Sequence, residues 1–319
     1  MSRFIIRHPS GYTAKIALAL TICLCMNART EAQYPAAFDR DAVRDASGAP
    51  VIAVLSADMA PYREALAGLR DILGADVPSF ILPYQQPLIT PATKVVITFG
   101  IKALQLDYPA SVAVVHTLAP AIRDYDSLRK SGLSVHIAMT PTAKVLIARL
   151  KTIQPGLKRL GIIWAGESVD FSIAALRIEA ENNGIALSAF RAAVPDDVPG
   201  VLRSINRQID ALWLPLDPAL LTAQSFEVIK EYALGNNMPL YVPTEKLVEA
   251  GAAASISTSF ADIGRTAAGA AKKILNSEKI EDAVYPAQVE TAINLVTAER
   301  IDFRFTDQVL KEAAGNIIR

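Results

Sequence analysis

The sequence predicts an α/β fold made of two doubly wound parallel-sheet lobes, and two features support the sheets. Continuous apolar runs such as Val51-Ile52-Ala53-Val54-Leu55 alternate with segments of helical periodicity. Strands that are buried on both faces lack polar alternation, so these runs favour a parallel sheet covered by helices on both sides. The same order of elements restarts after Gln154-Pro155-Gly156, which breaks a helix. A chain of 319 residues accommodates two such units.

The first unit carries five predicted strands. Pro61 opens a helix that runs to Leu73, and Thr140-Pro141-Thr142 precedes a second strong helix. Pro83 to Thr93 contains three prolines, so a helix there is short or absent. The predicted strands are Val51 to Leu55, Ser79 to Leu82, Lys94 to Phe99, Val112 to Thr117 and Leu133 to Ala138, and the other helices are Ile101 to Leu106 and Ala143 to Ile153.

The second unit repeats this pattern and ends in a tail helix from Asp307. Thr297-Ala298-Glu299 is expected to form a turn between the last strand and that helix. The expected strands are Arg159 to Trp164, Ile185 to Ala192, Ile209 to Pro215, Met238 to Pro243, Gly251 to Ser257 and Ala287 to Asn294, and the helices are Asp170 to Asn183, Val198 to Arg207, Thr222 to Asn236 and Asp262 to Leu275.

The first 32 residues read as a secretory signal peptide. A basic segment precedes an apolar run from Ile16 to Met26, and the chain then turns polar up to Ala32, where a cut is expected. A cut after Ala28 and an uncleaved membrane anchor are the alternatives, although the run is short for a span. Cys23 and Cys25 follow large residues, which disfavours a lipid anchor. We expect a periplasmic protein whose mature chain has no cysteine.

Charge and motifs exclude several classes of function. The chain has 32 basic and 32 acidic residues, and removing the first 32 residues leaves 28 and 31, a net of −3. No basic block is present, so no nucleic acid partner is expected. The sequence contains no Gly-x-Ser-x-Gly elbow, P-loop or His-x-x-x-His pair. We therefore expect a binding protein without cofactor or metal rather than an enzyme, with an exported α/β hydrolase as the alternative.

Ligands of such sheets bind beyond the carboxyl ends of the strands, so residues there are candidates. Ser56 and the following helix start could hold a carboxylate, and Asp58 an ammonium group, although Asp58 could simply cap the helix. Phe99 could stack on a ligand or belong to the core. The first-lobe candidates for ligand binding are Ser56, Asp58, Tyr62, Thr98, Phe99, Gly100, His116 and Thr117.

In the second lobe, several neighbouring strand ends carry small polar or acidic residues, which is a better signal than any one of them alone. For Asp217 the alternative is a solvated turn before Pro218. The second-lobe candidates for ligand binding are Trp164, Glu167, Asp217, Thr244, Ser257 and Ser259.

The stretch Asp210-Ala211-Leu212-Trp213-Leu214-Pro215-Leu216-Asp217-Pro218, with Met238-Pro239-Leu240-Tyr241-Val242 and Ile293-Asn294-Leu295-Val296-Thr297-Ala298, resembles the extracytoplasmic substrate-binding proteins of ABC importers. It is most similar to the branch that includes aromatic amino-acid binders. His116-Thr117-Leu118, Ala165-Gly166-Glu167 and Ser259 depart from the family pattern, which leaves the ligand class open.

The resemblance implies a type I periplasmic binding fold, in which several hinge crossings of the chain join the two lobes and the lobes close on the ligand. The first lobe would comprise 51–155 and 260–284, and the second 156–259 and 285–319. The ligand would be small and amino-acid-like or an organic anion, and the partner of the monomeric receptor would be an ABC permease. A sensory module that presents the ligand to a membrane kinase is the alternative.

Overall fold

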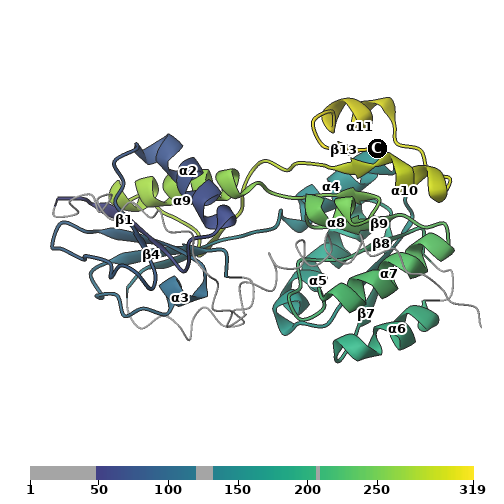
Figure 1. The fold of residues 1–319 in the computed structure, drawn as a ribbon, viewed down its shortest axis with the longest axis horizontal. Coiled ribbons are helices and arrows are strands. Elements are labelled where there is room, and N and C mark those ends of the chain that lie inside the picture. Colours follow the sequence, from purple (N-terminus) through teal and green to yellow (C-terminus); the bar gives the residue numbers. More distant parts are fainter. Residues whose placement is uncertain (1–47, 120–131, 206–208) are drawn as a thin grey trace, which may run out of the picture.

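The computed structural model describes residues 48–119, 132–205 and 209–319. The expected signal peptide, 1–32, lies outside these ranges. The described chain forms two lobes, and each lobe is built around its own sheet (Figure 1). Most strand pairs are parallel and helices alternate with them, so the α/β fold class is confirmed.

The first sheet has the strand order β11-β5-β4-β3-β1-β2, and all its pairs are parallel. Val51, Ala53 and Leu55 pack beneath α2 and α9, whereas Ile52 and Val54 pack on the opposite face, which includes Ala103 of α3. The elements of this lobe are β1 (Val51–Leu55), α2 (Ala60–Leu73), β2 (Ser79–Ile81), β3 (Val95–Phe99), α3 (Ile101–Leu104), β4 (Ala113–Thr117), β5 (Ser134–Ile137), α9 (Phe260–Leu275) and β11 (Ala283–Val284).

The second sheet has the order β13-β12-β10-β9-β8-β6-β7, in which only the β10–β12 pair is antiparallel among the described strands. Its elements are α4 (Ala143–Ile153), β6 (Arg159–Trp164), α5 (Glu167–Asn182), β7 (Ala186–Arg191), η2 (Pro195–Asp197), α6 (Val198–Ser204), β8 (Ala211–Trp213), α7 (Ala223–Gly235), β9 (Leu240–Val242), α8 (Glu245–Glu249), β10 (Ala254–Ser255), β12 (Ile293–Asn294), α10 (Leu295–Arg300), α11 (Asp307–Glu312) and β13 (Ile317–Ile318).

The C-terminal part differs from the sequence prediction. The long strand expected from Ala287 is reduced to β12, and a helix, α10, replaces the expected turn. The cause is local, because the side chain of Asn294 accepts a hydrogen bond of 2.9 Å from the amide of Thr297. This N-cap starts a helix directly after the strand. The tail strand β13 was not predicted, since two apolar residues alone carry no strand signal.

Helix α4 corrects the expected lobe boundary at Gln154-Pro155-Gly156. Its apolar face, which includes Leu146, Ile147 and Leu150, belongs to the same core as Leu160 and Ile162 of β6. The helix therefore belongs to the second lobe, and the chain leaves the first lobe before it, at 138–142. A Pro-Gly break marks the end of a helix, but the packing of its apolar face decides which lobe it joins.

Between the described elements the chain passes from one sheet to the other at 138–142, 256–259 and 285–292 (Figure 1). The guanidinium of Arg149 on α4 donates to Thr291 Oγ1 at 2.7 Å and forms an ion pair with Glu312 on α11. This side chain fixes the end of the third crossing against the second lobe. The second crossing delivers α9 to the first lobe, where it lies beside α2.

His136 makes the first lobe sensitive to acid. Its ring stacks on that of His116 with centroids 5.2 Å apart, and burial lowers the pKa of His136 to about 4. The unfolded chain takes up this proton near pH 6.5, so the neutral ring contributes stability above that pH, and the contribution is lost as the pH falls towards 4. We expect a loss of about 2 kcal/mol between pH 7 and 5.

Urea unfolding at both pH values measures this loss, and His136→Gln should flatten the pH dependence. An unchanged slope in the variant would contradict the assignment.

Within the described residues, none of the helices has the length and apolar content that a membrane span requires.

Candidate functional site

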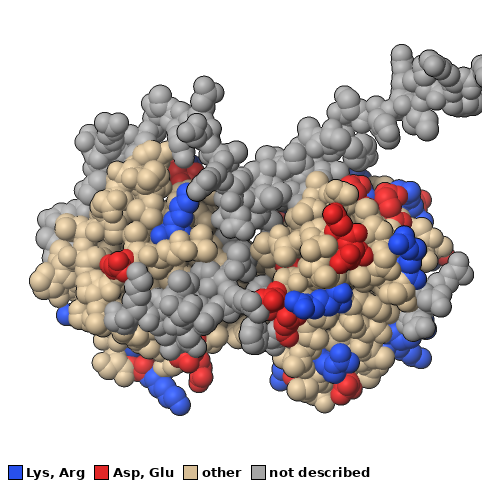
Figure 2. All heavy atoms as spheres, turned by 90° about the horizontal axis from the view of Figure 1, so that it is seen from below, with Lys and Arg blue, Asp and Glu red and all other residues tan. Residues whose placement is uncertain are grey.

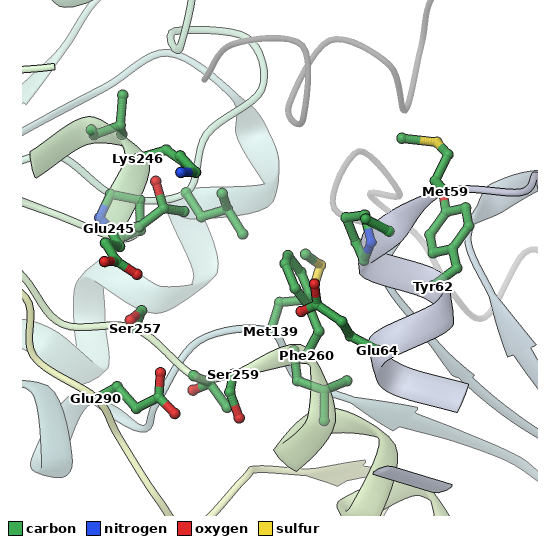
Figure 3. Close-up of a pocket in the computed structure, with 18 of the residues that line it drawn as sticks. Met59, Tyr62, Glu64, Met139, Glu245, Lys246, Ser257, Ser259, Phe260 and Glu290 are labelled. Atoms are coloured by element: carbon green, nitrogen blue, oxygen red, sulfur yellow. The ribbon is translucent and has the colours of Figure 1, made fainter. Parts of the chain in front are cut away.

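A cavity of about 410 Å³ lies where the two lobes face each other. This volume falls in the range that binds small molecules. Its first-lobe wall is the N-terminal end of α2, with Met59, Tyr62 and Glu64, and the start of α9, with Phe260. Figure 3 shows Met59, Tyr62 and Glu64 across from Glu245, Ser257 and Glu290, with Met139 and Phe260 nearer the middle.

The second-lobe wall follows the ends of β8 and β9. Leu216 and Leu221 come after β8, and Thr244 to Leu247 come after β9 and begin α8. The crossing residues Ser257, Thr258 and Ser259 complete this side together with Glu290, whose backbone pairs with that of Ser257 in an antiparallel bridge. The wall therefore joins residues of the second and third crossings, which α9 and β11 separate in the chain.

Four of the fourteen residues proposed from sequence line this cavity: Tyr62, Thr244, Ser257 and Ser259. Ser259 also caps α9, since its hydroxyl accepts a hydrogen bond of 3.1 Å from the amide of Asp262. The structure thus brings together candidates from both lobes and from one crossing. Their contact with a ligand stays a prediction.

The candidates at the ends of β1 and β3 serve the packing of the first lobe. Ser56 is buried, and its hydroxyl accepts a hydrogen bond of 2.9 Å from the amide of Ala103. Thr98 and Phe99 are fully buried. Gly100 has a φ of 92°, and a Cβ there would lie 2.4 Å from the hydroxyl of Tyr62, so glycine is required for close packing.

The other first-lobe candidates also have partners within their own lobe. Asp58 forms an ion pair with Arg63, and it does not cap α2, whose N-cap is Met59. Thr117 is buried and donates to the carbonyl of Ile137 at 2.9 Å, and His116 is buried against His136. None of Asp58, His116 and Thr117 lines the cavity.

The candidates at the ends of β6 and β8 have structural partners within the second lobe. Asp217 is fully buried, and its carboxylate accepts hydrogen bonds from the amides of Ala165 at 2.7 Å, Gly166 at 2.8 Å and Ala219 at 3.0 Å. Trp164 donates from Nε1 to Asp170 at 2.6 Å. Glu167 lies 3.9 Å from Arg191. Asp217 therefore holds the β6–α5 turn, and the sequence interpretation as a ligand contact lacks support.

Sequence reasoning missed the acidic side chains of the cavity, Glu64, Glu245 and Glu290, and its apolar residues Met59 and Phe260. Glu245 and Phe260 each adjoin a candidate, so extending the strand ends by one residue would have found them. Glu290 carried no signal, because its place depends on the bridge to Ser257.

The pKa of Glu290, one of the carboxylates that line the cavity, is raised. Burial raises its pKa, and the nearby carboxylates of Asp262 and Glu245 raise it further, while Arg265 opposes them. Lys246, on the same side, donates to Glu249 at 2.7 Å, and this bond raises the pKa of Lys246. The described residues include no group of three or more metal-ligating side chains. On the face shown in Figure 2, acidic and basic residues of the described chain are interspersed.

Comparison with known families gives a match over residues 126–317 to the family described as ABC transporter substrate binding protein. No curated protein sequence matches the chain significantly.

Several solved structures share the fold. The open, ligand-free CD0873 of Clostridium difficile, a substrate binding protein with adhesive properties, aligns with a TM-score of 0.61 and 15% identity over 84% of this chain and 97% of its own. A conserved domain protein of Vibrio cholerae aligns with a TM-score of 0.57 and 17% identity over 85% of this chain and 100% of its own. An ABC domain of Streptococcus pneumoniae in complex with L-Trp aligns with a TM-score of 0.55 and 16% identity over 84% of this chain and 99% of its own. These identities support a common fold and no more.

Proposed function

Because the chain belongs to the family of ABC transporter substrate binding proteins, we propose that it is the extracytoplasmic receptor of an ABC importer. It captures a small ligand between its lobes and presents the closed form to a membrane permease. The observation that supports this is the 410 Å³ cavity, which residues of both lobes line. Proteins of this family and fold bind rather than convert their ligands.

Closure by a hinge explains why the cavity walls come from separate lobes. Short crossings such as 138–142 and 256–259 absorb a rotation of one lobe against the other while each sheet remains intact. A ligand enclosed by both walls loses water, which strengthens each of its hydrogen bonds. The L-Trp complex of the pneumococcal protein makes amino-acid-like molecules the first class to test.

The test is a thermal-shift screen of the mature protein against amino acids, amines, small acids and sugars, followed by small-angle X-ray scattering. A ligand is expected to raise the melting temperature and to reduce the radius of gyration, because closure buries both walls. Turnover of the compound, or stabilisation without compaction by every hit, would reject the receptor.

The variant Ser257→Trp should place an indole in the cavity and weaken binding by about tenfold or more. Ser204→Trp is the matched control, because Ser204 lies on the exposed end of α6 and does not line the cavity. Isothermal titration of both variants with the hit measures the difference. Equal affinities would place the ligand elsewhere.

A further inference from the structure

The charges of the cavity are unbalanced. Among the described residues, its lining includes the carboxylates of Glu64, Glu245 and Glu290, and one basic side chain, that of Lys246. The ammonium of Lys246 is already paired with Glu249 outside the lining. The described part of the lining contains no arginine. A ligand that enters this space therefore meets a net negative charge from the described side chains.

Nearby cations of the described chain do not correct this imbalance. The closest candidate is Arg265, whose guanidinium donates to Asp262 at 2.6 and 2.9 Å and to Asp71 at 3.0 Å. The carboxylate of Glu290 has no hydrogen bond or ion pair with described residues, and its neighbours Asp262 and Glu245 disfavour its charge. A cation beside Glu290 would relieve this repulsion.

The helix starts around the cavity offer little to an anion. In α2, Pro61 has no N–H, and the amides of Tyr62 and Arg63 donate to the carbonyl of Met59 at 3.1 and 3.0 Å. In α9, the first turn already carries Asp262. In the short helix α8, Glu245 occupies the same position. Among the first four residues of α2, the amide of Ala60 alone is a donor without an acceptor among the described residues, so a carboxylate would find one donor at this helix start.

A second, independent observation is a buried hydroxyl group that has no hydrogen-bond partner among the described residues. Thr258 lines the cavity and is 9% exposed, and its Oγ1 is buried without a hydrogen bond among the described residues. A buried hydroxyl without a partner is costly in a folded protein. An N–H group of a ligand would satisfy this oxygen.

The rest of the lining suits a ligand whose positively charged group is attached to an apolar part, called the body below. Phe260 presents an aromatic ring and Met139 a polarizable thioether near the middle of the cavity, and Met59 and Tyr62 lie at its first-lobe end (Figure 3). Aromatic faces attract organic cations as well as apolar groups, and thioethers pack against rings of varied shape. The lining thus combines acidic groups with surfaces that tolerate an ammonium group.

Resting on the proposed receptor function, we propose that the cavity binds a small organic cation, an amine with an aromatic or aliphatic body and no carboxylate. The ammonium group lies between Glu290 and Glu245, and a rotation of the Thr258 side chain brings Oγ1 to one of its N–H groups. The body packs against Phe260 and Met139. This ligand departs from the amino-acid-like or anionic ligand expected from sequence, because a carboxylate finds no unpaired cation among the described residues of the lining.

A series of ligands with one apolar body and different charges tests the proposal. Isothermal titration compares phenethylamine, phenylalanine and 3-phenylpropionate at pH 7.5. We expect the amine to bind about tenfold more tightly than the zwitterion, and the acid to bind least. Tightest binding by the zwitterion or the acid, with compaction on binding, would overturn the cation assignment and leave the receptor function intact.

If phenethylamine and its analogues give no heat of binding, a second screen compares aliphatic and cyclic amines with acids that have the same apolar part. Hits confined to acids or sugars would overturn the cation assignment. Absence of any hit together with absence of compaction counts against the receptor function as well.

The variant Glu290→Gln removes one charge from the cavity at nearly constant volume. We expect the variant to bind the amine about tenfold more weakly, and to bind the acid with unchanged or higher affinity. Glu281→Gln is the control, since Glu281 is exposed and outside the lining, and it should change neither affinity. Urea unfolding of both variants verifies that they fold. Equal amine affinities in the two variants would overturn the role of Glu290.

Discussion

Gly264→Ala is expected to lower the free energy of unfolding by about 3 to 5 kcal/mol, above the usual cost of overpacking. A Cβ at this position would lie 1.8 Å from the carbonyl oxygen of Ala65 and 2.9 Å from the amide nitrogen of Leu69. Both atoms belong to the backbone of α2, so no side chain can rotate away. The two helices would have to separate along their whole contact.

Gly269→Ala is the matched control, because it lies in the same helix and a Cβ there meets nothing within 4 Å. It should stabilise the protein by about 0.5 to 1 kcal/mol, since alanine favours helix over glycine. Urea unfolding measures both changes. Similar effects of the two substitutions would mean that the contact between α2 and α9 is not close packed.

This contact matters for the site as well as for stability. Phe260 begins α9 and Met59 caps α2, and both line the cavity. Gly68 repeats the close approach on the other helix, where a Cβ would lie 2.0 Å from the carbonyl oxygen of Ala261. We infer that the two glycines set the distance between the helix starts that form the first-lobe wall.

Asp217→Ala should cost about 3 to 5 kcal/mol of unfolding free energy, because three amide N–H groups lose a charged acceptor. The amides of Ala165 and Gly166 shape the turn before α5, and their donors would be left unpaired. Asp217→Asn should be nearly as damaging, since one of its two groups would present N–H to N–H.

Asp196→Ala provides the comparison, because Asp196 is exposed in η2 and should change stability by less than about 0.5 kcal/mol. Thermal and urea unfolding, followed by ligand titration of the folded fraction, separate the two roles of Asp217. Unchanged stability with lost ligand affinity would restore the sequence interpretation of Asp217 as a ligand contact.

The sequence located most elements well, because their signals are local. Helix α4 was predicted at Ala143 to Ile153 and has these bounds, with Thr142 accepting the amide of Val145 as its N-cap. Apolar runs on β1 and β3 identified strands that are buried on both faces. The lobe that α4 joins was assigned wrongly, since this depends on a partner that is distant in the chain.

The candidate site was harder to predict than the fold. In sheets of this kind a ligand lies beyond the carboxyl ends of the strands. Searching these ends in the sequence identified Thr244 and Ser257, which line the cavity. The same search also identified Ser56 and Asp217, whose oxygens accept backbone N–H groups. A serine or aspartate after a strand has the same sequence signal whether it faces a ligand or an amide. Only the position of the amide distinguishes them.

By itself the sequence determined the α/β class and the alternation of strands and helices, because hydrophobic periodicity and caps act between near neighbours in the chain. The resemblance to a family of substrate-binding proteins came from motifs such as Asp210 to Pro218. The tertiary structure decided which lobe α4 joins, how closely α9 approaches α2 and which side chains surround the cavity. Those outcomes depend on contacts between residues far apart in the chain, such as Ser257 with Glu290. A local pattern of residue types carries no record of such pairs.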